Sequence, residues 1–195
     1  MIFGILLAAG MGRRMGIPKA LVQFGDHTLH ARGVALFRVA GLEVIVVANP
    51  AVAAALPPAR PGEWRVVNEC PDHESGMFGS VQMGVLDAMA RGASGAILLP
   101  VDFPLVSADD VLAIAASLDG GASIVVATHR SRRGHPVGMS RPIMGEVMAA
   151  KPGTTLRDLV RKDPVRVSVI EVSEGAILGV NTKDELERLL AMSFR

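Results

Sequence analysis

Five short apolar runs recur along the chain, and a longer stretch of mixed polar and apolar residues follows each one. The runs are nearly continuous in hydrophobic side chains, which is typical of strands buried on both faces of a sheet. The sequence therefore predicts buried strands at residues 2–7, 43–48, 64–67, 96–100 and 124–127.

The stretches between these runs carry apolar residues at helical spacing, and polar residues stand where helices would begin. Thr28 and Ser107 can each accept a hydrogen bond from the first turn of a helix. Thr182 and Glu185 match a capping box before the last helix. The longest helix is expected at residues 76–91.

The second half of the chain departs from this regular alternation. Residues 130–138 are basic and contain glycine, which predicts a hairpin or an excursion of the chain. Two short helices are expected near residues 142–149 and 155–161. Residues 165–169 alternate strictly between apolar and polar, so they predict a strand with one buried face. Residues 51–62 are rich in Ala and Pro and are expected to form a surface connection.

Repeated strand–helix units favour a three-layer α/β fold, in which helices cover both faces of a mostly parallel sheet. We expect residues 1–195 to form a single domain of this kind, because the chain is long enough for one sizeable core. In such sheets ligands bind beyond the carboxyl ends of the strands. The loops after residues 7, 67, 100 and 127 should therefore meet at one binding edge.

Composition narrows the class of protein. Half of the residues are hydrophobic, so the chain is globular, and its net charge of +1 gives no support for a nucleic-acid partner. No apolar run approaches the roughly 20 residues of a membrane span. The only cysteine, Cys70, can form no intramolecular disulfide, which fits the reducing cytoplasm. We therefore expect a cytoplasmic protein that binds neither nucleic acid nor membrane.

A glycine-rich, basic loop follows the first predicted strand. It combines three glycines with three cations: Gly10, Gly12, Gly16, Arg13, Arg14 and Lys19. Glycines let a ligand approach the main chain, and successive free N–H groups form a concave anion site. The loop therefore predicts a site for phosphates, and the alternative is a tight turn with a solvated basic edge.

Two common phosphate-binding loops do not match this segment. A Walker A loop would have Ser or Thr after its lysine, but Lys19 is followed by Ala20. A dinucleotide fingerprint would have glycine at Met15 and an acid after the second strand, where Ala48-Asn49-Pro50 stands. The loop is therefore a phosphate site of a different kind.

One known family shares this pattern. The segment reads Leu7-Ala8-Ala9-Gly10-x-Gly12-x-Arg14-Met15-Gly16-x-Pro18-Lys19. It resembles the signature of the nucleotidyltransferases with a Rossmann-like fold. Within that group, it is most similar to the molybdenum cofactor cytidylyltransferases and their guanylyl and sugar-nucleotide relatives. The resemblance implies that the loop holds the nucleotide, with contacts from Leu7, Ala8, Ala9, Gly10, Gly12 and Arg13. Arg14 and Lys19 would be catalytic cations that neutralise charge on the α-phosphate and the leaving pyrophosphate.

A carboxylate follows the fourth predicted strand. Asp102 is suited to bind a hard cation such as Mg²⁺, or it forms a turn before Pro104, and the residues alone leave both interpretations open. In the resembling family an Asp-x-Pro-Leu segment carries the metal here, which implies a catalytic, Mg²⁺-binding role for Asp102. Asn181 matches the amide version of the second metal ligand, with ordinary turn chemistry before Thr182 as a strong alternative.

The segment after the third predicted strand is expected to bind the base and the ribose. The amide of Asn68 is one candidate for contact with the base. The resembling family has a Gly-Met-x-x-Ser motif here, which implies the same role for Gly76, Met77 and Ser80. Without the resemblance, Ser75 would be only a helix cap. Cys70 and His73 lack the further pair of ligands that a zinc site needs.

A basic turn is the candidate acceptor site. It reads Arg132-Arg133-Gly134-His135-Pro136-Val137, and arginines with a histidine can bind a phosphate-bearing acceptor. A solvated basic hairpin is the common alternative for such a charge run. The resembling cofactor nucleotidyltransferases have Gly-x-Pro-Val beside the acceptor, which implies that His135 lies there. Arg157 either adds a phosphate contact or is an exposed helix residue.

These motifs together favour an Mg²⁺-dependent nucleotidyltransferase. The resemblance implies transfer of CMP from CTP to a phosphorylated acceptor with release of pyrophosphate; molybdopterin is the favoured acceptor, and a molybdoenzyme could receive the product. The methyl group of Ala9 narrows the slot beside the base, which favours CTP over GTP. The alternatives are a guanylyl or sugar-phosphate transferase and a nucleotide-binding accessory protein without turnover.

Overall fold

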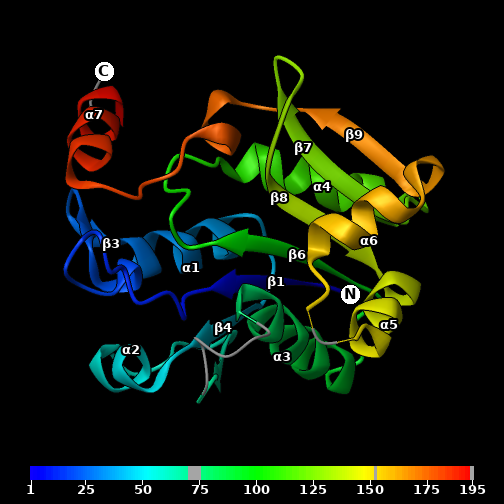
Figure 1. Ribbon diagram of the computed structural model, residues 1–195, viewed down its shortest axis with the longest axis horizontal. Helices are drawn as coiled ribbons and strands as arrows, with labels where there is room; N and C mark the ends of the chain where they lie inside the picture. Colours follow the sequence, from blue (N-terminus) through cyan, green and yellow to red (C-terminus); the bar gives the residue numbers. More distant parts are fainter. Residues whose placement is uncertain (70–75, 152, 194–195) are drawn as a thin grey trace.

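A seven-stranded sheet forms the centre of the computed structural model, which describes residues 1–69, 76–151 and 153–193. The strands are β1 (Ile2–Leu7), β4 (Val44–Ala48), β5 (Glu63–Val67), β6 (Gly95–Pro100), β7 (Ile124–His129), β8 (Arg132–Ser140) and β9 (Val167–Glu171). They lie in the order β5-β4-β1-β6-β8-β7-β9 (Figure 1), and every neighbouring pair is parallel except the two that involve β8. The mostly parallel α/β sheet is therefore confirmed.

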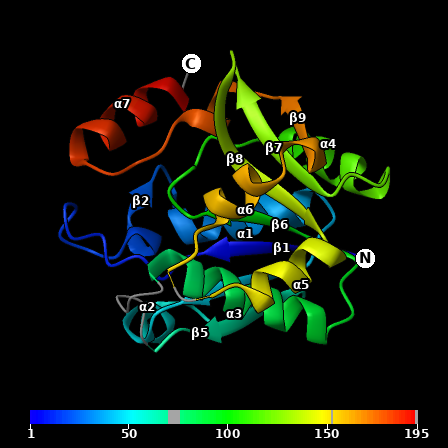
Figure 2. The same cartoon turned by 45° about the vertical axis from the view of Figure 1, so that its right-hand side comes forward.

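Helices cover both faces of the sheet, which gives the expected three layers. Leu6 belongs to one core and its neighbour Leu7 to the other, because successive side chains of a strand point to opposite faces. The first core is covered by α1 (Leu29–Val39) and α4 (Ala108–Asp119), and the second by α3 (Gly76–Ala90), α5 (Arg141–Ala149) and α6 (Leu156–Lys162), as Figures 1 and 2 show. Within the described residues, none of the helices has the length and apolar character needed to cross a membrane.

The polar residues expected at helix starts form the caps. The hydroxyl of Thr28 accepts a hydrogen bond from the first turn of α1, and Ser107 forms a capping box with Asp110 at the start of α4. Thr182 and Glu185 bond reciprocally, at 3.0 and 3.2 Å, before α7 (Lys183–Ser193). These bonds satisfy N–H groups that have no partner inside the helix, so the three predicted starts are confirmed.

Two predicted segments need correction. The connection after β4 contains a short helix, α2 (Pro50–Ala55), because Asn49 caps it and Pro50 is suited to the first helical position. The predicted strand at residues 165–169 begins only at Val167, because a 3₁₀ turn from Pro164 leaves Val165 exposed. The structure also adds the short elements η1 (Lys19–Leu21), β2 (Gln23–Phe24), β3 (His27–Thr28), η2 (Pro164–Arg166) and η3 (Glu174–Ile177).

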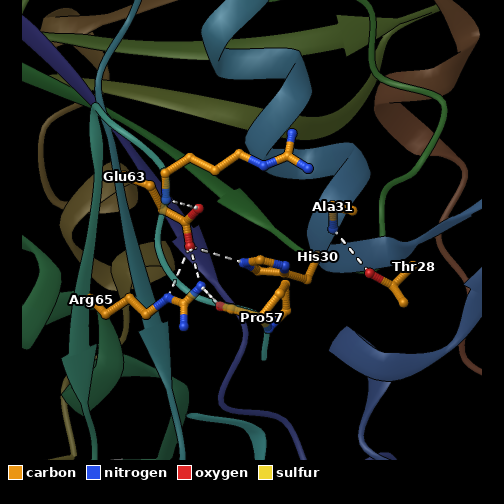
Figure 3. Close-up of polar contacts among 7 residues, drawn as sticks. Thr28, His30, Ala31, Pro57, Glu63 and Arg65 are labelled. Atoms are coloured by element: carbon orange, nitrogen blue, oxygen red, sulfur yellow. Dashed lines mark hydrogen bonds and ion pairs between the residues drawn. The ribbon is translucent and has the colours of Figure 1, made fainter. Parts of the chain in front are cut away.

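A buried ionic cluster ties the start of α1 to the edge strand β5 (Figure 3). Oε1 of Glu63 accepts hydrogen bonds from Nε and Nη2 of Arg65 at 2.9 and 2.7 Å, and Nε2 of His30 lies 3.5 Å from the same oxygen. The N–H of Arg60 donates to the other carboxylate oxygen at 3.3 Å. Burial lowers the pKa of His30 against the opposing field of Glu63, so the imidazole is neutral at pH 7.

Candidate active site

The loop after β1 is shaped by two of its glycines. Gly12 has φ +59°, and a Cβ atom there would lie 1.9 Å from the carbonyl oxygen of Ile17, so no other residue fits. Gly16 has φ +77°, which glycine adopts without strain. The N–H groups of Met15 and Gly16 both donate to the carbonyl of Gly12, at 2.7 and 3.0 Å. The loop is therefore a defined turn at the carboxyl end of β1.

Asn49 anchors the start of this loop, a role that the sequence analysis missed. Its Nδ2 donates to the carbonyl of Ala9 at 2.9 Å, and its Oδ1 accepts the N–H of Val52 at 2.8 Å. The N–H of Ala8 also donates to Val47 at 2.8 Å. The main chain of Ala8 and Ala9 is thus fixed against β4, while Gly10 emerges at the surface. The Asn-Pro pair before an alanine-rich run could have indicated the cap.

Three predicted site residues from distant parts of the chain converge at the carboxyl ends of β1 and β6. Nζ of Lys19 contacts Oδ2 of Asp102 and donates to Oδ1 of Asn181 at 2.8 Å. The N–H of Val180 donates to the carbonyl of Asp102 at 2.8 Å, which holds the segment before α7 against the end of β6. Oε2 of Glu185 accepts the N–H of Asn181 at 2.7 Å, and this bond lowers the pKa of the Glu185 carboxyl.

Asp102 and Asn181 suit a divalent cation that arrives with a substrate. Among the described residues, no group of three or more His, Cys, Asp or Glu side chains could hold a metal ion. One carboxylate and one amide oxygen suffice for Mg²⁺ where substrate phosphates and water complete the octahedral set of ligands. Lys19 is the cation that the fold brings to these oxygens, whereas Arg13 and Arg14 lie on the exposed part of the loop.

The residues predicted to bind the base lie beside this edge. Nδ2 of Asn68 donates to Oγ of Ser80 at 2.9 Å, and both side chains are buried, so Ser80 orients the amide of Asn68. Gly76 begins α3 with φ +47°, and Met77 is 65% exposed at the rim of a large cavity. Cys70, His73 and Ser75 lie outside the described residues.

The cavity beside Met77 has a volume of about 890 Å³ and an apolar floor with a basic rim. The floor comes from the sheet and from the two helices in front of it: Leu7, Leu98, Val126, Val137, Phe78, Val81, Leu156 and Val160. Four arginines line it from β8 and α6: Arg132, Arg133, Arg157 and Arg161. Because none of the described lining residues is Asp or Glu, the cavity favours an anionic ligand with an apolar body.

His135 lies in the wall of this cavity. Its ring centroid is 4.6 Å from that of Phe103, which follows Asp102 at the end of β6. Burial lowers the pKa of His135 to about 4, although the carboxylate of Asp102 opposes the shift, so the imidazole is neutral at pH 7. Within the described part of the chain, its buried Nδ1 has no hydrogen-bond partner. His135 thus lies against Phe103 in the cavity that Arg132 and Arg133 also line.

Comparison with known proteins assigns the chain to a family. Residues 4–167 match the family described as the MobA-like NTP transferase domain. The nicotine blue oxidoreductase of Paenarthrobacter nicotinovorans is 31% identical and covers 97% of this chain and 96% of its own length. A probable molybdenum cofactor guanylyltransferase of Opitutus terrae is 33% identical over 54% of this chain and 50% of its own length.

Solved structures share the fold over nearly the whole chain. The crystal structure of an Rv0371c homologue from Mycobacterium sp. strain JC1 has a TM-score of 0.82 and 29% identity, and covers 100% of this chain and 97% of that one. The complex of Rv0371c from Mycobacterium tuberculosis H37Rv with manganese has a TM-score of 0.76 and 26% identity, with 97% of each chain covered.

Proposed function

The chain belongs to the MobA-like NTP transferase family, and from this membership we propose that it transfers CMP from CTP to a phosphorylated acceptor such as molybdopterin and releases pyrophosphate. The observation that carries this proposal is the convergence of Lys19, Asp102 and Asn181 at the carboxyl edge of the sheet, next to the glycine loop. Residues 1–195 would act as one nucleotidyltransferase domain.

The proposed reaction needs charge and position more than a protein nucleophile. An oxygen of the acceptor phosphate attacks the α-phosphorus in line, a new P–O bond forms, and the bond to the β-phosphate oxygen breaks as pyrophosphate leaves. Phosphoryl transfer of this kind depends on alignment and on cations that neutralise the developing charge. The N–H groups of residues 10–14, with Arg14 and Lys19, would supply these contacts to the triphosphate.

Asp102 and Asn181 would hold Mg²⁺ in this proposal. The support is the donor set itself, because a carboxylate and an amide oxygen that meet beside the phosphate loop match the preference of hard cations. Bound there, Mg²⁺ would neutralise phosphate charge and fix the geometry of the triphosphate. Glu185 fixes the main chain at Asn181 by accepting its backbone N–H, and the N–H of Val180 holds the same segment against Asp102.

The arginine-rimmed cavity supports a phosphorylated acceptor. Arg132 and Arg133 come from the predicted acceptor turn, and α6 adds Arg157 and Arg161. Guanidinium groups bind phosphate oxygens in bidentate geometry, and an apolar floor suits a flat ring system such as a pterin. The molybdenum cofactor relative supports the choice of molybdopterin, with a molybdoenzyme as the recipient of the product.

Pyrophosphate release with CTP, UTP, GTP and ATP, each with molybdopterin, tests the proposal. We expect kcat/KM for CTP to exceed that for GTP by about tenfold to a hundredfold, because a clash with Ala9 costs about 1–3 kcal/mol. The variant Ala9→Gly should reduce the difference in kcat/KM between CTP and GTP. Equal values in the wild type, or a preference for GTP, would move the chain to the guanylyl branch. No release with any NTP would rule out molybdopterin as the acceptor, and no release when a sugar phosphate replaces molybdopterin would contradict transferase activity.

The nicotine blue oxidoreductase relative supplies a second candidate activity, because its match covers nearly both full chains. An oxidoreductase of this size would need a redox cofactor such as a nicotinamide dinucleotide. The glycine loop lacks the dinucleotide pattern at Met15, and no acid follows β4, so the sequence disfavours such a cofactor. Two assays distinguish transferase from oxidoreductase activity: oxidation of NADH with a dye acceptor, and pyrophosphate release. Oxidation of NADH without pyrophosphate release would favour the oxidoreductase.

A further inference from the structure

Lys19 occupies the space between the two oxygen groups that the proposed function assigns to the metal. Its ammonium group contacts Oδ2 of Asp102 and donates to Oδ1 of Asn181 at 2.8 Å. The side chains of Lys19 and Asp102 are 19% and 16% exposed, so they are largely enclosed but still within reach of a ligand. A lysine thus uses the same oxygens that a divalent cation would need.

Lys19 in this position and a metal bound to the same two oxygens compete with each other. An ammonium group has only donors, and a hard cation binds only acceptor oxygens, so both require the carboxylate and the amide oxygen. A metal at about 2.0–2.2 Å from these oxygens would also lie against the positive charge of the lysine, and water screens that repulsion poorly in a largely enclosed site. A metal bound to both oxygens is therefore favoured when the ammonium group of Lys19 has moved away.

We propose that Lys19 blocks the cation site until a nucleotide arrives, so that the protein selects the metal–nucleotide complex over the free metal. This inference rests on the proposed nucleotidyltransferase function. Lys19 begins η1 immediately after the glycine loop, and its flexible side chain can turn from Asp102 to a phosphate while the main chain stays in place. The triphosphate offers the ammonium a new partner and thereby opens the two ligands to the metal.

Coupling between the two ligands follows from this exchange. Metal alone must break the contacts of Lys19 without replacing them, whereas the metal–nucleotide complex replaces them with phosphate contacts. Nucleotide should therefore strengthen metal binding, and metal should strengthen nucleotide binding by the same factor. Removal of the Lys19 charge should change the two affinities in opposite directions. The affinity for free metal should rise, and the affinity for nucleotide should fall.

Mn²⁺ binding measured by EPR tests the inference without any assay of turnover, because the signal of free Mn²⁺ disappears on binding. In the absence of nucleotide, we expect Lys19→Met to bind Mn²⁺ about tenfold more tightly than the wild type, within the usual range of coupling between sites. Lys183→Met is the matched control, because it makes the same substitution at an exposed lysine two residues after Asn181, and its Mn²⁺ affinity should stay near that of the wild type. Adding Asp102→Asn to Lys19→Met should abolish the gain.

The outcomes separate this inference from the proposed function. Calorimetric titration of the wild type with a nonreactive CTP analogue, with and without Mn²⁺, measures whether the metal–nucleotide complex binds at all. If it binds, and neither Lys19→Met nor the second variant Lys19→Gln gains Mn²⁺ affinity, this inference is overturned and the proposed function stands. If the wild type binds no complex, the proposed function falls, and this inference falls with it. Circular dichroism confirms that each variant is folded.

Discussion

Two ionic clusters in this protein have similar chemistry and different access. In one, Glu63 pairs with Arg65 next to His30, and the side chain of Glu63 is only 2% exposed. In the other, Asp102 pairs with Lys19 and is 16% exposed at the open end of the sheet. Each cluster joins segments far apart in the sequence, but only the second can be reached by a ligand.

The difference separates an ion pair that stabilises the fold from one that can change partners. Both oxygens of Glu63 accept hydrogen bonds from groups of the protein, so the buried cluster keeps its partners and stabilises the fold. Asp102 instead shares Lys19 with a neutral amide. In the proposed exchange, Lys19 turns to a phosphate, and the oxygens of Asp102 and Asn181 turn to a metal. Variants in the two clusters should therefore affect different properties.

The largest effect is expected when the open cluster loses its carboxylate. Asp102→Asn should lower pyrophosphate release about a thousandfold, because metal-assisted stabilisation of the transition state supplies several kcal/mol. The melting temperature should change little, since the amide can still accept a hydrogen bond from Lys19. The exposed Asp109→Asn is the matched control and should keep wild-type turnover. Release by Asp102→Asn within tenfold of the wild type would show that the metal role of Asp102 is wrong.

The buried cluster should show the opposite result. Glu63→Gln leaves Arg65 without its counter-charge, which should lower the free energy of unfolding by about 2–3 kcal/mol. Turnover per folded molecule should stay unchanged, because the cluster lies outside the candidate site. Urea denaturation measures the loss, and the double variant with Arg65→Gln should lose less than the sum of the two single changes. If the two losses in the free energy of unfolding simply add, the interaction between Glu63 and Arg65 does not stabilise the fold.

A smaller effect concerns pH, through His30. Its pKa is lowered in the folded protein, so below about pH 6.5 the unfolded chain takes up a proton that the folded protein does not. The free energy of unfolding should therefore fall as the pH decreases through this range, by at most about 1.4 kcal/mol per pH unit for one proton. His30→Gln should flatten that dependence, whereas the exposed His27→Gln should not. An unchanged slope in His30→Gln would contradict the assigned shift.

Much of the fold can be predicted from local pattern, because the buried strands and capped helices depend on nearby residues. The apolar runs at β1, β4 and β6 and the caps at Thr28 and Ser107 are of this kind. The insertion of β8 between β6 and β7 depends instead on which strands pair, and a hairpin pattern does not contain that information. The start of β9 was missed because strict alternation continued into a turn that Pro164 begins.

The candidate site divides in the same way. The glycine loop can be found as a local motif, because its glycines and cations suit phosphates. The metal roles expected for Asp102 and Asn181 come instead from the resemblance to a known family, since the residues alone leave ordinary turns as alternatives. The contact of Lys19 with the other two cannot be found in this way, because it joins positions separated by 83 and 162 residues. Asn49 was missed for a related reason: its amide acts on Ala9, in a different strand–loop unit.

The hydrogen bond from the N–H of Val180 to the carbonyl of Asp102 has a practical consequence for sample preparation. The family match ends at residue 167, yet the chain beyond it supplies the rest of β9 and also Asn181. A recombinant protein trimmed to the matched range would uncover the edge of β7, which is a template for aggregation, and would lose Asn181 from the candidate site. Expression clones intended for crystallisation or ligand screening should therefore extend through α7.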